Sequence, residues 1–199
     1  MRRIYADTAF FGQPAEAFFD DRELFCDLGV EVYLEHYPSY AFVAQEAGTI
    51  AGYIVGNPEG DGGVHRRLLA RLPAILVRLL RGRYRLGRKT LRYLMDNTWA
   101  GLTGGLLEVR DERYPANLHI NVAQGHRSRG LGTSLVERYL EKLRLAGVPG
   151  VHAVTSDGNP GASSLFQKLG FELLDERRTA VWKRHLGQDV TLLAYGLRL

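Results

Sequence analysis

The sequence contains, at positions 124–133, the stretch Gln124-Gly125-His126-Arg127-Ser128-Arg129-Gly130-Leu131-Gly132-Thr133. A strand-like alternation of apolar residues ends just before it at Val122, and a helical apolar repeat begins within it at Leu131. Glycines let the backbone approach a ligand closely, and the first N–H groups of a helix attract an anion. The stretch therefore predicts an anion-binding loop between a strand and a helix.

The spacing of the loop excludes two common nucleotide motifs. It has no Gly-Lys-Ser/Thr triplet, which a Walker loop requires, and no G-x-G-x-x-G, which is typical of a dinucleotide fold. An ordinary glycine-rich turn remains the alternative at this point.

The rest of the chain alternates between strand and helix patterns around this loop. Strands are predicted at 40–44, 50–55, 118–122, 151–154, 171–174 and 190–199, and helices at 20–37 (one or two), 131–143 and 160–169. The first two strands are joined through Ala47-Gly48, which predicts a hairpin.

Two motifs in this order resemble those of the GNAT superfamily of acyl-CoA N-acyltransferases. The loop matches R-x-x-G-x-G, and the downstream pattern N-x-x-A-x-x-x-[YF]-x-x-L-G-F is matched by Asn159, Ala162, Phe166, Leu169, Gly170 and Phe171. The hairpin at 40–55 resembles the one that precedes the family's cofactor strand. The likeness covers residues 40–56 and 116–199.

The resemblance implies an α/β (mixed α+β) fold with a central, twisted, largely antiparallel sheet, splayed at the cofactor strand and flanked by helices. It also implies acetyl-CoA, or another acyl-CoA, as cofactor. The residues expected to bind it are Asn121, Val122, Ala123, Arg127, Ser128, Arg129, Gly130, Leu131, Gly132, Thr133, Asn159 and Phe166. Asn159 also suits the cap of the helix that begins at Pro160.

Direct attack by an amine needs a base, and His119 is the first candidate because a histidine side chain titrates nearest neutrality. A structural, hydrogen-bonding histidine is the alternative. Glu108 and Glu35 are weaker candidates for the base. The family's usual tyrosine acid is replaced by Phe166, so Tyr195, Ser164 or a water is expected to protonate the thiolate. No metal is expected.

Length and composition predict one domain over residues 1–199, which the resemblance implies is an acyltransferase domain, with a helical insertion at about 57–115. Net charge is +4, yet residues 65–92 hold nine arginines and one lysine without an acid, and the remaining 16 basic and 22 acidic residues give −6. Within the insertion, Leu72 and Leu76 fall on an apolar helix face, the arginines fall largely opposite, and Pro73 predicts a kink or a restart.

The basic insert has three interpretations: a solvated basic face on a helix that covers the acceptor cleft, attraction of an acidic substrate or nucleic acid, or contact with an anionic membrane through 65–92. The first is favoured. The lone Cys26 and the lack of a signal sequence or membrane span favour a cytoplasmic location. A homodimer through the strand-like C-terminus is a further expectation.

The sequence thus predicts an N-acyltransferase that moves an acetyl or other acyl group from acyl-CoA to a primary amine of unspecified identity. The alternative, which Phe166 in place of the usual tyrosine leaves open, is a non-catalytic acyl-CoA-binding or regulatory module with a basic docking helix.

Overall fold

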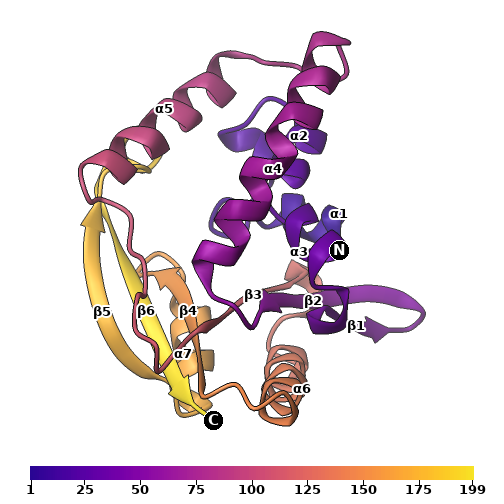
Figure 1. The fold of residues 1–199 in the computed structure, drawn as a ribbon, viewed down its shortest axis with the longest axis vertical. Helices are drawn as coiled ribbons and strands as arrows, with labels where there is room; N and C mark the ends of the chain where they lie inside the picture. Colours follow the sequence, from indigo (N-terminus) through magenta and orange to yellow (C-terminus); the bar gives the residue numbers. More distant parts are fainter.

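The protein is described by a computed structural model that covers residues 1–199, with residue 61 described by its backbone alone. Its elements, labelled in Figure 1, run in the order α1 (Arg2–Asp7), η1 (Ala15–Ala17), α2 (Arg22–Leu28), α3 (Glu31–His36), η2 (Pro38–Tyr40), β1 (Phe42–Glu46), β2 (Thr49–Asn57), α4 (Asp61–Leu80), α5 (Arg88–Leu102), β3 (Ala116–Val122), η3 (Gln124–His126), α6 (Leu131–Leu145), β4 (Gly150–Ser156), α7 (Pro160–Lys168), β5 (Glu172–Thr179), α8 (Lys183–Leu186) and β6 (Val190–Arg198).

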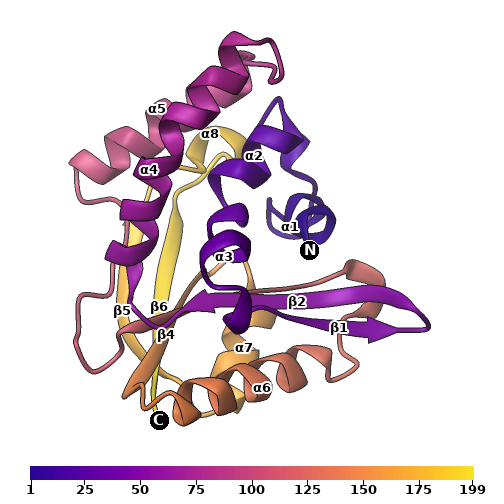
Figure 2. The same ribbon diagram turned by 45° about the vertical axis from the view of Figure 1, so that its right-hand side comes forward.

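The six strands form one sheet in the order β1-β2-β3-β4-β6-β5. Every neighbouring pair is antiparallel except β3 and β4, which run parallel and pair only through Ala116–Val151 and Asn117–His152. Beyond Asn117 the two strands separate, and Figures 1 and 2 show β1–β3 and β4–β6 extending in different directions from this point. The predicted largely antiparallel sheet, splayed at the strand before the loop, is confirmed.

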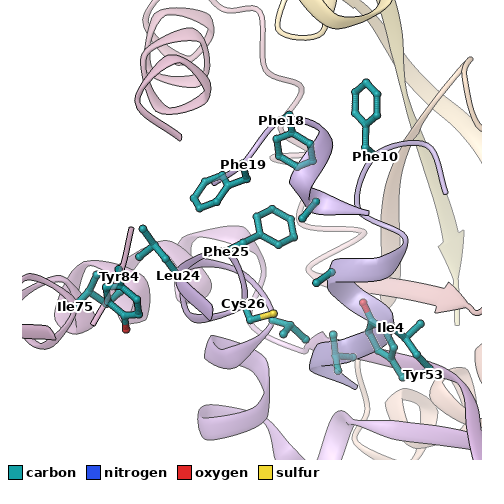
Figure 3. Packing of buried hydrophobic residues seen from close by; sticks show 14 residues of the cluster. Ile4, Phe10, Phe18, Phe19, Leu24, Phe25, Cys26, Tyr53, Ile75 and Tyr84 are labelled. Carbon is teal, nitrogen blue, oxygen red and sulfur yellow. The ribbon is translucent and has the colours of Figure 1, made fainter. Parts of the chain in front are cut away.

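Two hydrophobic clusters hold helices against the sheet. The first joins α1, η1, α2 and α4 to β2 and contains Ile4, Phe10, Phe18, Phe19, Leu24, Phe25, Tyr53 and Ile75 (Figure 3). The second joins α6 and α7 to β3, β4 and β6 and contains Leu118, Leu135, Val136, Tyr139, Leu140, Leu143, Val151, Phe166 and Tyr195. The predicted helical repeat of α6 therefore buries the residues that its period indicates.

The two helices of the insertion, α4 and α5, lie between β2 and β3 in the chain, and α4 continues through Pro73. The arginines of α4 divide between solvent and the body of the protein, since the side chains of Arg66 and Arg78 are 77% and 50% exposed and that of Arg71 is 12% exposed. Arg71 pairs with Glu35, and Arg78 Nη1 lies 2.8 Å from Asp27 Oδ2. Leu76, by contrast, is 54% exposed.

The expectation of a solvated basic face on α4 is therefore wrong in part. The acids of α2 and α3 form a negative surface, so pairing arginines with it satisfies both charges. On the apolar side, Ile75 and Leu79 pack in the first cluster, while Leu72 and Leu76 face outward. None of the helices in the described part of the chain is long and apolar enough to cross a membrane.

The C-terminal strand β6 is an interior strand. It pairs with β4 on one side, from Gly150–Arg198 to Ser156–Leu192, and with β5 on the other. Both of its edges are hydrogen-bonded within the chain, so it offers no free edge to a second copy, and a homodimer through this strand stays a prediction.

Candidate functional site

The open edge of β3 is the first part of the candidate site. Ala123 N–H donates to Ala51 O at 2.8 Å, continuing the pairing with β2, and antiparallel alternation turns the backbone groups of Val122 and Ile120 the other way. Val122 O accepts from Arg127 Nε at 3.2 Å on that side. Of the predicted backbone contacts, Val122 therefore faces the split, whereas the backbone groups of Asn121 and Ala123 pair with β2. The backbone of Ile120 also faces the split, although the sequence did not predict it as a contact.

The loop after β3 has a backbone conformation that suits the binding of an anion. Ser128 and Gly130 have φ values of +61° and +81°, and Gly130 is the N-cap of α6. The first amides of a helix have no partner within it, so those of Leu131, Gly132 and Thr133 are available to a ligand. A Cβ on Gly132 would lie 3.2 Å from Leu165 Cδ2, so this glycine also lets α6 approach α7.

Glu46 of β1 neutralises part of the loop's charge. Its carboxylate contacts His126 Nδ1 and lies 3.0 Å from Arg129 Nη1. The hydrogen bond from His126, followed by that from Arg129, lowers the pKa of Glu46 below its usual value. Arg127 has no carboxylate partner among the described residues, so it is the cation left to meet an anionic ligand.

A cavity of about 340 Å³ lies in the split between β3 and β4 and extends to the N-terminal segment, α5 and the residue before α8 (Lys183–Leu186). It is lined by Tyr5, Thr8, Ala9, Phe11, Gly12, Phe18, Phe25, Tyr93, Leu118, His119, Ile120, Asn121, Arg127, Val154, Thr155, Ser156, Asn159, Ala162, Phe166, Trp182 and Leu192. It joins the predicted base to the predicted cofactor loop.

His119 lies in this cavity among rings. Its imidazole is 5.4 Å from the Tyr5 ring and 6.0 Å from the Tyr53 ring, centroid to centroid, and Asn121 Nδ2 lies 3.4 Å from its Nε2. Burial lowers the pKa of His119 from 6.5 to about 4, because the charged form loses its hydration. The side chain is therefore neutral at physiological pH and has a lone pair with which to accept a proton.

Asn159 and Phe166 also line the cavity. Asn159 Oδ1 accepts from Ala162 N–H at 3.3 Å and caps α7, as its position before Pro160 indicates. Phe166 is buried and packs on Phe171 at 5.3 Å. Asn159 therefore caps a helix and Phe166 packs in the core, and both side chains also border the space open to a ligand.

Other predicted catalytic residues do not line the cavity. Tyr195 is buried on β6 against Phe166, at 5.8 Å between ring centroids. Glu108 lies exposed between α5 and β3, 2.7 Å from Arg110 Nη2, because the chain after α5 runs over the outer surface. Glu35 pairs with Arg71, and Ser164 is exposed on α7. The structure does not bring these side chains to His119.

Six aromatic side chains that sequence analysis missed line the other end of the cavity. Together they are called the ring wall here: Tyr5, Phe11, Phe18, Phe25, Tyr93 and Trp182. The density of phenylalanines between positions 10 and 25 was a usable signal. Tyr93 and Trp182 gave none, since only the fold brings α5 and the segment before α8 to this place.

Comparison with known proteins places these features in a family. The profile of the acetyltransferase (GNAT) family matches residues 1–171. The crystal structure of SsHAT is 26% identical, with a TM-score of 0.67, over 99% of this chain and 91% of that one.

Two further structures share the fold at lower identity. Ribosomal-protein-alanine N-acetyltransferase from Brucella melitensis is 18% identical, with a TM-score of 0.57, over 100% of this chain and 91% of that one. YncA from Salmonella typhimurium, solved with acetyl-CoA, is 16% identical, with a TM-score of 0.58, over 100% and 86% of the two chains.

Proposed function

The chain belongs to the GNAT family of acetyltransferases, and we propose that it transfers an acetyl group from acetyl-CoA to the nitrogen of a primary amine by direct attack. The observation that carries this proposal is the parting of β3 and β4 after Asn117, with an anion-binding loop at the end of β3. The split offers unpaired strand backbone to an extended ligand, and the loop offers amides and Arg127 to its phosphates.

The residues present fit an acyl-CoA. The amides of Leu131, Gly132 and Thr133 and the guanidinium of Arg127 would hold the pyrophosphate. The backbone groups of Ile120 and Val122 on the open edge would hold the extended arm and polarise the carbonyl. When bound, acyl-CoA supplies a thioester whose thiolate is a tolerable leaving group, since a thiol has a pKa of about 8.5.

His119 is proposed to accept the proton of the amine. An alkylammonium ion, with a pKa of about 10 as in lysine, is too weak an acid to protonate so buried an imidazole, so the amine attacks in its neutral form. Its lone pair forms the C–N bond while the C–S bond breaks and that electron pair leaves with sulfur. The N–H groups of the amine become much more acidic once its nitrogen bonds to the carbonyl carbon. Nε2 of His119, which is the acceptor toward Asn121 Nδ2 and so carries the lone pair, can then take a proton.

Phe166 gives sulfur no proton donor, and Tyr195 lies behind it in the core. We therefore propose that water, rather than a tyrosine, protonates the departing thiolate. Because the pKa of the CoA thiol is low, the thiolate can leave before it is protonated, and protonation by water is sufficient for turnover.

The cofactor site is tested first by thermal stabilisation, because a ligand that binds only the folded state raises its stability. Acetyl-CoA and CoA should raise the melting temperature, and NAD at the same concentration should not. Gly130→Glu should abolish the shift. Gly147→Glu is the matched control, since Gly147 also has a positive φ, +68°, and open space around it, at the far end of α6.

Catalysis is tested separately, by thiol release from acetyl-CoA across a panel of primary amines. Turnover that His119→Gln lowers by roughly 100-fold, within the range of general-base catalysis, supports the proposed base. CoA binding without release from any amine would instead support the non-catalytic acyl-CoA-binding alternative. A protein that neither CoA nor acetyl-CoA stabilises would retain only the fold of the family.

A further inference from the structure

The ring wall forms a continuous aromatic surface that ends beside His119. Phe18 lies 4.9 Å from Tyr93 and 5.0 Å from Trp182, centroid to centroid. Tyr5 stacks on Phe25 at 4.8 Å and meets the imidazole of His119 edge-on at 5.4 Å. The rings come from α1, α2, α5 and the segments next to η1 and α8, so five parts of the chain converge here. Figure 3 shows Phe18 and Phe25 gathered with Phe19 and Phe10.

These rings do more than fill a core. Phe18 and Phe25 belong to the first hydrophobic cluster, but Tyr5, Phe11, Tyr93 and Trp182 are only partly buried, and all six border the same cavity. Aromatic faces prefer offset or edge-to-face contact with another ring. The part of the cavity that ring faces and edges bound therefore favours a flat aromatic group.

The charge of the lining restricts the ligand further. Among the described residues that line the cavity, none carries a carboxylate, and the only formal charge is that of Arg127 at the loop end. A polyamine, an aminoglycoside or a basic peptide would bring a second ammonium group into this space without a partner, which costs a great deal in a low-dielectric site. One amine, neutral when it attacks, avoids that cost.

The volume is consistent with a small acceptor. About 340 Å³ is near the lower end of ligand pockets, and the acyl end of the cofactor must share this space with the acceptor. The part next to the ring wall suits a single ring with a short chain.

We propose that the acceptor is a small arylalkylamine, a planar aromatic ring that carries one primary amine on a short chain, and that the ring wall is its binding site. This assignment rests on the proposed N-acetyltransferase function. The ring contacts Tyr93 and Trp182 while the amine is directed toward His119 and the open edge of β3.

The acceptor class is tested by kcat/KM for thiol release at saturating acetyl-CoA. The comparison uses 2-phenylethylamine, hexylamine, spermidine and a short peptide with a lysine and a free N-terminus. We expect 2-phenylethylamine to exceed spermidine and the peptide by about 100-fold or more, because their additional charges have no partner. We expect it to exceed hexylamine by about tenfold, because the flexible chain lacks ring contacts.

The binding site is tested by Tyr93→Leu and Trp182→Leu, which remove a ring and keep an apolar side chain. Each should raise KM for 2-phenylethylamine by about tenfold and leave the thermal shift with CoA unchanged, and Tyr93→Phe should restore KM. Trp99→Leu is the matched control on the same helix, since Trp99 is 69% exposed and outside the cavity; its KM should equal that of the wild type.

Two results would overturn the assignment while the proposed function stands. One is equal or faster acetylation of spermidine or the peptide. The other is an unchanged KM in both leucine variants, provided that each still shows the CoA-induced shift and is therefore folded. Absence of thiol release with every amine would instead reject the N-acetyltransferase function, and this assignment with it.

Discussion

Burial of a single imidazole links the cavity to the stability of the protein. The pKa of His119 falls from 6.5 to about 4 on folding. Between these pH values His119 therefore binds a proton in the unfolded chain but not in the folded chain. The stability that depends on neutral His119 is complete above pH 6.5 and is lost as pH falls through this window, by about 3 kcal/mol in total. Urea denaturation at pH 7 and pH 4.5 should show a smaller decrease in unfolding free energy for His119→Gln than for the wild type.

The control for that experiment is His36→Gln, because His36 is exposed at the end of α3. This variant should retain the wild-type dependence on pH. Identical pH dependence in the wild type and in His119→Gln would mean that His119 is hydrated in solution, and the neutral base assigned to it would lose its physical basis.

At the scale of an element, α4 has adjacent residues with opposite environments. Ile75 is 8% exposed in the first hydrophobic cluster, whereas Leu76 is 54% exposed. Ile75→Ala should reduce the unfolding free energy by about 2–4 kcal/mol, through lost burial and a residual cavity, and Leu76→Ala by less than about 0.5 kcal/mol. Chemical denaturation of the two variants provides the measurement.

Both substitutions introduce alanine into the same helix, so helix propensity favours neither variant greatly. A loss for Leu76→Ala as large as that for Ile75→Ala would show that the outward face of α4 is covered in solution, or that α4 packs in the orientation that the sequence suggested. Either result would contradict the described placement of the arginines.

The separation of β3 from β4 is a property of the whole sheet, and amide hydrogen exchange reports it. Without ligand, the amides of Ile120 and Val122 on the open edge should exchange quickly, and those of Asn121 and Ala123, which face β2, should exchange slowly. Acetyl-CoA in the split should protect Ile120 and Val122. The measurement is residue-resolved exchange by NMR with and without the ligand.

In the Gly130→Glu variant acetyl-CoA should leave these two amides unprotected, whereas Gly147→Glu should behave as the wild type. Slow exchange of Ile120 and Val122 in the free protein would indicate that the sheet is closed at this edge. A closed edge would remove the binding site from the split.

Local pattern was enough to predict much of the molecule. The loop at 124–133, helix α6, the hairpin of β1 and β2 and the strand β6 follow from glycine positions and apolar periodicity, which neighbouring residues encode by themselves. The capping position of Asn159 is of the same kind. The order of the two motifs then indicated the family, and with it the splayed sheet.

Tertiary structure alone decided the identity of the ring wall, the charge state of His119 and the orientation of α4. Tyr93 and Trp182 are 89 positions apart, and only the packing of α5 and the segment before α8 around the split brings them together. The same packing left Glu108 on the outer surface. Pairing partners and desolvation are set by residues distant in the chain, and no local period encodes them.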